Sequence, residues 1–128
     1  MKVLYTEILK QFPEIQRLTS EGDEEAGYLM MNHLAEWLGE GDNIDADEVI
    51  PRIETFVKWC DSQPRGDTAA DDILTMLVVG FYEKLFRYEQ ARKILPRIIS
   101  KEHFVKSAEY WIAWVGKENY DDAAQYYN

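Results

Sequence analysis

The chain has 128 residues, of which 46% are hydrophobic, 13% aromatic and 30% charged, and this composition excludes intrinsic disorder and predicts one domain over residues 1–128. Its 24 acidic and 14 basic residues give a net charge of −10, so we expect a basic protein partner and no binding to nucleic acid or membrane. The single cysteine forms no internal disulfide, and the sequence shows neither a secretory signal nor a membrane-spanning apolar run, so we expect a cytoplasmic protein.

Apolar residues recur at helical spacing from one end of the chain to the other. The spacing predicts a first helix over residues 3–12, which Pro13 ends or converts into a short second helix over residues 14–20. Asp23 has the position of an N-cap for the next helix, residues 24–38. That helix carries an apolar stripe and is followed by glycines that favour its termination.

The middle of the chain contains two further helix starts. Asp45 and Glu48 have the spacing of a capping box ahead of a third helix, whose apolar stripe runs from Val49 to Cys60. A turn follows, and Asp67 or Thr68 caps the fourth helix. Residues 73–86 are apolar on almost every side, which predicts a helix at the centre of the fold.

The last third of the chain predicts two more helices. Residues 88–95 form a short one that Pro96 ends or kinks, and Ser100 caps a final helix that Gly116 closes. The pattern leaves open whether residues 119–128 are ordered or form a flexible tail. We therefore expect an all-α, single-domain bundle of five to seven helices around the apolar helix at about 73–86.

Acidic residues concentrate in the middle of the sequence. Residues 39–72 hold ten acidic and three basic residues, whereas residues 73–128 hold seven acidic and eight basic ones. One acidic group precedes the third helix and another precedes the fourth. If these two helix starts lie at the same end of the bundle, they form one acidic face that attracts a basic protein. The alternative is that the acidic residues serve only the solubility of the protein.

Four aromatic residues lie beside the apolar stripes of their helices, namely Trp37, Trp59, Tyr110 and Trp114. Aromatic side chains at a surface are favoured anchors of protein interfaces, although Trp37 and Trp59 could equally close the edge of the core. The predicted partner-binding residues are Asp42, Asp45, Asp47, Glu48, Asp67, Asp71, Asp72, Trp37 and Trp59.

Catalytic and metal-binding patterns are weak. His33 and Cys60 could form a dyad only through the tertiary structure, because no local motif activates either of them. Oxygen-bearing side chains between Asn43 and Glu54 partly match a calcium loop, but Glu48 occupies the position at which that loop needs glycine. The sequence therefore predicts neither an enzyme nor a bound metal or cofactor.

Three segments carry a resemblance to a known group of proteins. His33-Leu-Ala-Glu-Trp37-Leu, the helix ending Glu54-Thr-Phe-Val-Lys-Trp59, and the run from Ile73 to Leu85 resemble small acidic all-helical bacterial proteins of unassigned function, over roughly residues 28–115. Some of those proteins are immunity proteins of toxin/immunity systems. The matching positions are mostly of core type, so the resemblance bears on fold more than on role.

These observations lead to one expected function and two alternatives. The resemblance and the acidic charge favour a non-catalytic immunity protein that neutralises a bacterial toxin, such as a nuclease, through an acidic and aromatic face. The first alternative is a cytoplasmic adaptor or regulatory protein with an apolar groove. The second is a small enzyme that uses His33 or Cys60. The sequence does not indicate the oligomeric state.

Overall fold

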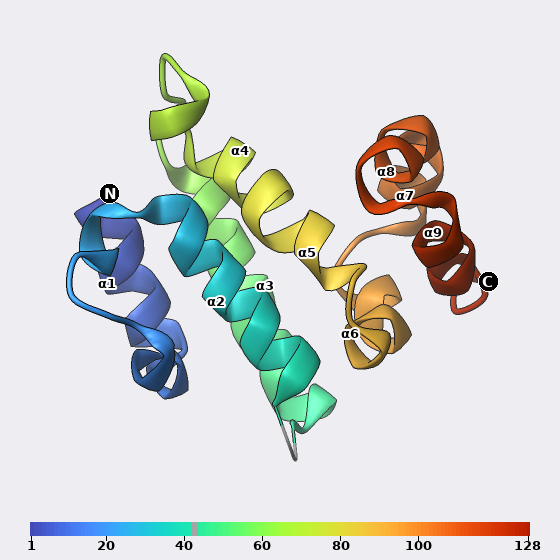
Figure 1. The fold of residues 1–128 in the computed structure, drawn as a ribbon, viewed down its shortest axis with the longest axis horizontal. Coiled ribbons are helices and arrows are strands. Elements are labelled where there is room, and N and C mark those ends of the chain that lie inside the picture. The colour runs from blue at the N-terminus through green and yellow to red at the C-terminus, as the bar shows by residue number, and fades with distance from the viewer. Residues whose placement is uncertain (42–43) are drawn as a thin grey trace.

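A computed structural model describes residues 1–41 and 44–128, and in those residues every regular element is helical (Figure 1). The α-helices are α1 (Lys2–Gln11), α2 (Gly27–Glu40), α3 (Ala46–Ser62), α4 (Ile73–Met76), α5 (Glu83–Leu85), α6 (Glu89–Ile94), α7 (Lys101–Lys106), α8 (Ala108–Val115) and α9 (Lys117–Ala124). Four short 3₁₀ turns cover Pro13–Leu18, Asp23–Glu25, Ala69–Asp71 and Leu95–Arg97. The all-α class is confirmed.

The described residues contain nine α-helices, more than the five to seven expected. The helix expected at 73–86 is continuous, but its middle, Leu77–Tyr82, is a π-helix that separates α4 from α5. The helix expected after Ser100 is divided at Ser107 into α7 and α8. Hydrophobic spacing does not distinguish α from π hydrogen bonding. It therefore predicts a single α-helix where the backbone changes from α to π geometry and back.

Several helix ends agree with their sequence signals. The side chains of Asp45 and Ser100 cap α3 and α7 by accepting from Asp47 and His103 amides. Gly116 follows α8 with a φ of +90°, a conformation that favours glycine. Asp23, in contrast, begins a 3₁₀ turn and does not cap α2, which starts only at Gly27.

The helix from α4 through α5 lies at the centre of the bundle, as expected. It packs on α2 along its length, while α8 packs against its α5 end (Figure 1). Phe81, Leu85 and Phe86 are fully buried along it, and Trp111 of α8 packs on Phe86 with ring centroids 5.1 Å apart. None of the helices in the described residues combines the length and the apolar character needed to cross a bilayer.

Candidate functional site

The acidic residues at the start of α3 are engaged in local contacts. Asp45 caps the helix through the Asp47 amide at 3.0 Å. The Asp47 carboxylate pairs with Arg97 at 2.9 Å, and Glu48 pairs with Arg52 at 3.2 Å. Asp42, the remaining predicted member of this group, lies outside the described residues.

The acidic residues before α4 also support the fold. Asp71 and Thr68 form a capping box around the 3₁₀ turn. Asp72 caps α4 and accepts two hydrogen bonds from Arg65, at 2.9 and 2.8 Å. Asp67 is exposed in the same loop.

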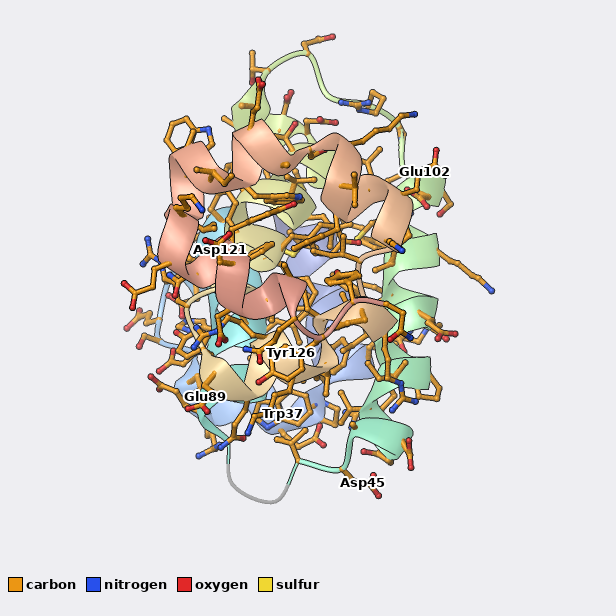
Figure 2. All side chains as sticks on the ribbon, turned by 90° about the vertical axis from the view of Figure 1, so that its right-hand side faces the viewer. Trp37, Asp45, Glu89, Glu102, Asp121 and Tyr126 are labelled. Atoms are coloured by element: carbon orange, nitrogen blue, oxygen red, sulfur yellow. The ribbon has the colours of Figure 1, made fainter. Side chains whose placement is uncertain are left out.

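The structure does not bring the two acidic groups onto one face. The first group lies at the beginning of α3, and the second follows the end of the same helix, which is 17 residues long and so spans about 25 Å. Asp45, labelled near the bottom of Figure 2, and the loop before α4, at the top of the same view, lie at opposite ends of the molecule. The single acidic face expected from the sequence is therefore not formed.

Trp37 and Trp59 belong mainly to the core. Trp37 is only 6% exposed and packs edge-on against Phe12, with ring centroids 5.8 Å apart. Trp59 is half-buried and stacks on Phe56. The sequence left open whether Trp37 is an interface anchor or closes the edge of the core, and its burial shows that it closes the core edge.

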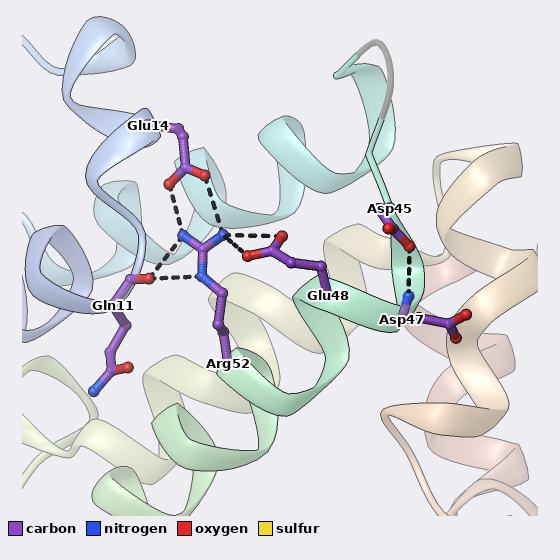
Figure 3. A network of polar contacts seen from close by, with 6 residues as sticks. All are labelled: Gln11, Glu14, Asp45, Asp47, Glu48 and Arg52. Carbon is purple, nitrogen blue, oxygen red and sulfur yellow. Dashed lines mark hydrogen bonds and ion pairs between the residues drawn. The ribbon is translucent and has the colours of Figure 1, made fainter.

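Arg52 of α3 links that helix to the end of α1 and to the 3₁₀ turn that follows it (Figure 3). Its guanidinium donates to the Gln11 carbonyl at 3.0 and 2.8 Å and to the Glu14 carboxylate at 2.6 Å, and Glu48 accepts from its other side. The same group lies 5.5 Å from the ring centre of Trp37. Because Arg52 joins the end of α1 to α3, this network has a structural role.

The exposed aromatic surface lies instead on α8. Trp114 is 67% exposed and Tyr110, one turn earlier, is 36% exposed. Tyr110 and Trp114 lie beside the apolar stripe of α8 and are exposed, whereas Trp37, which the sequence placed in the corresponding position on α2, is buried. Val79, from the exposed side of the π-helix, is also 36% exposed. Trp111, which lies on the inward stripe of α8, is fully buried.

Two cavities lie between the central helix and the α7–α8 segment, and Tyr110 lines both. One, of about 350 Å³, is lined by Val79, Glu83, Lys84, Arg87, Tyr110 and Trp114. The other, of about 460 Å³, is lined by Arg65, Leu74, Thr75, Val78, His103, Ser107, Tyr110 and Trp111. We name the two cavities together the aromatic groove. Its π-helical wall is notable because π segments are frequent at functional sites.

The charged groups of the aromatic groove differ in how they are paired. Arg65 is neutralised by Asp72, and Glu83 accepts a hydrogen bond from the Tyr110 hydroxyl. Burial and this bond to Glu83 raise the pKa of Tyr110, so its hydroxyl stays protonated at neutral pH. Lys84 and Arg87 make no ion pair with any residue that the structure describes.

His33 and Cys60, the residues of the enzyme alternative, have separate surroundings. His33, on α2, has its Nε2 atom 3.2 Å from Oδ2 of Asp23, which lies in the 3₁₀ turn before that helix. Burial, assisted by the charge of Asp61, raises the pKa of the Cys60 thiol to about 12, so that thiol is a poor nucleophile at neutral pH. The described residues contain no cluster of metal-ligating side chains.

Comparisons with known proteins add no relative: no family model, no curated protein and no solved structure matches this chain.

Proposed function

We propose that this chain is a non-catalytic binding protein that holds a protein partner in the aromatic groove. The observation that carries the proposal is the exposure of Trp114 and Tyr110 beside the two cavities. Trp, Tyr and Arg dominate the binding energy of protein interfaces, and Arg87 adds the third of these residue types to the same cavity. Exposed apolar side chains that gather at a concave surface indicate an interaction site.

The more specific form of the proposal is that the partner is a bacterial toxin domain and the chain is its immunity protein in the cytoplasm. The resemblance described above and the net charge of −10 support it. Long-range attraction would draw a basic toxin toward the acidic residues 1–72, and packing in the aromatic groove would then hold it. No catalytic turnover is involved.

An adaptor whose partner is not a toxin is the second candidate, because an apolar groove serves that role equally well. The two differ in one measurable property. An immunity protein relieves the growth arrest caused by the product of a neighbouring gene, whereas an adaptor does not. Coexpression of the chain with each neighbouring gene product, followed by growth curves, separates them.

The test of the groove compares two tagged variants purified from the native cells. Trp114→Ala removes the most exposed anchor, and Val105→Ala removes an exposed apolar residue of α7 that lines neither cavity. Loss of a central anchor costs about 2 kcal/mol, roughly thirtyfold in affinity. We expect Trp114→Ala to lose the partner and Val105→Ala to keep it.

Circular dichroism and urea unfolding of both variants should match the parent, because both side chains are mainly exposed. A partner that is retained equally by the parent and by the correctly folded Trp114→Ala variant would exclude the aromatic groove as its binding site.

A further inference from the structure

One end of the aromatic groove carries positive charge on a strongly negative protein. Lys84 and Arg87 line the smaller cavity and are ion-paired with none of the residues described by the structure. The one carboxylate of this cavity, on Glu83, already accepts from Tyr110. We name Lys84 and Arg87 the cationic edge.

The geometry of two helices places this edge beside apolar surface. Val79, Glu83, Lys84 and Arg87 come from the central helix and the turn that follows it, and all four line the smaller cavity. Tyr110 and Trp114 are one turn apart on α8, and α8 contacts α5. The two helices therefore present a cavity of about 350 Å³ with apolar walls and cations along one side.

We infer that the cationic edge binds an acidic side chain on the partner, within a segment whose apolar residues fill the cavity between Val79 and Trp114. This inference rests on the proposed function and adds the chemistry of the contact. A guanidinium and an ammonium free of carboxylate partners complement a carboxylate, and the indole and valine complement an apolar side chain. The larger cavity is a poorer site for an acidic side chain, because its arginine, Arg65, is already paired with Asp72.

A protein segment fits this surface better than a small molecule. Tyr110 lines both cavities, so together they offer room for more than one side chain of a peptide segment. A pocket built for a small ligand encloses most of the ligand's surface. Trp114, which is 67% exposed, instead stands at an open edge of the cavity. A partner that is basic as a whole can still offer one acidic side chain at this contact.

Two synthetic peptides test the inference by NMR titration of the isotope-labelled protein. The acidic peptide is acetyl-Glu-Leu-Glu-Leu-Glu-Phe-amide, and the basic peptide replaces each glutamate by lysine. The indole N–H signal of Trp114, assigned with a Trp114→Phe variant, reports binding in the smaller cavity. The net charge of −10 favours the basic peptide non-specifically, so a preference for the acidic peptide at Trp114 must arise in the groove.

We expect the acidic peptide to shift the Trp114 signal and the basic peptide to shift it less. In the double variant Lys84→Glu/Arg87→Glu, binding of the acidic peptide should weaken roughly tenfold or more. The matched control, Lys2→Glu/Lys10→Glu on α1, makes the same change in net charge away from the groove and should weaken it far less.

Three results would overturn the inference: no Trp114 shift with the acidic peptide, a stronger shift with the basic peptide, or equal weakening in the two double variants. None of them alters the partner-capture comparison of Trp114→Ala with Val105→Ala. If Trp114→Ala loses the natural partner while Lys84→Glu/Arg87→Glu keeps it, the groove binds the partner and the acidic contact is wrong. Retention of the partner by Trp114→Ala would contradict the proposed function itself.

Discussion

Single acidic side chains in this protein are occupied by contacts that stabilise the fold. Asp72 is the strongest case, because Arg65, the Thr75 hydroxyl and the Gly66 amide all donate to its carboxylate. The Arg65 guanidinium, followed by the Thr75 hydroxyl, holds the pKa of Asp72 well below its usual range. A carboxylate that is bound in this way in the folded state stabilises the protein only while it is ionised.

Asp72→Asn should therefore lower stability in a pH-dependent way. Because the folded pKa of Asp72 lies below the unfolded value of about 4, its contribution is complete above about pH 5 and is lost progressively as the pH falls toward the folded pKa. We expect the difference in unfolding free energy between the parent and Asp72→Asn to shrink between about pH 5 and pH 3. Urea unfolding across this range measures it.

Asp67→Asn is the matched control for this titration, since Asp67 is exposed in the same loop. Its unfolding free energy should follow that of the parent at every pH. A difference for Asp72→Asn that stays constant as the solution is acidified would show that the carboxylate charge is not what stabilises the start of α4.

At the scale of elements, the π-helix is held by close packing on α2. A Cβ on Gly80 would lie 2.7 Å from the Cβ of Met31 and 3.3 Å from the Tyr28 carbonyl oxygen. Glycine thus allows the central helix and α2 to approach closely where the backbone widens into π geometry. The same segment carries Val79 on its outer side, so this packing also positions one wall of the aromatic groove.

Gly80→Ala should destabilise the protein by about 1–3 kcal/mol, because the added methyl group forces two packed helices apart. This cost outweighs the gain of about 0.4–1 kcal/mol that Gly→Ala provides through the unfolded chain. Chemical denaturation measures the change, and Val79→Ala, at an exposed position in the same segment, should shift stability by no more than about 0.5 kcal/mol. A Gly80→Ala variant as stable as the parent would contradict the close approach.

Sequence reasoning predicted the elements well where local signals exist. The spacing around Asp45, Ser100 and Gly116 predicted three helix ends, because capping depends on residues within one turn. The change from α to π geometry within the 73–86 helix has no such local signal. The π segment packs on α2, and hydrophobic spacing alone contains no information on that packing.

At the scale of the whole molecule, the C-terminal segment completes the core. Tyr120 and Tyr127 both stack on the ring of Phe104, with ring centroids 4.5 and 4.1 Å from it. The Tyr127 hydroxyl donates to the Ile99 carbonyl at 2.9 Å, and Ala123 of α9 is fully buried. Tyr120, Ala123 and Tyr127 all fall in residues 119–128, whose order the sequence left open, and they cover the aromatic side chains around Phe104.

Removal of residues 117–128 should therefore lower the unfolding free energy by about 3 kcal/mol or more, because it exposes Phe104 and its aromatic neighbours to water. Urea unfolding followed by tryptophan fluorescence measures the loss. Deletion of Asn128 alone, an exposed residue, is the control and should change little. An unchanged urea midpoint in the longer deletion would mean that α9 adds nothing to the core.

The sequence by itself determined the all-α class and the central apolar helix, because hydrophobic periodicity records which side of each helix is buried. It did not determine which aromatic residues are exposed, since Trp37 has the same position relative to its stripe as Trp114 and is buried. The sequence also determined how much acidic charge the middle of the chain carries. Only the tertiary structure decided where that charge lies: α3 runs the length of the bundle between the two acidic groups and separates them. Distances between helix ends follow from the direction in which each helix packs, which no local pattern of residues records.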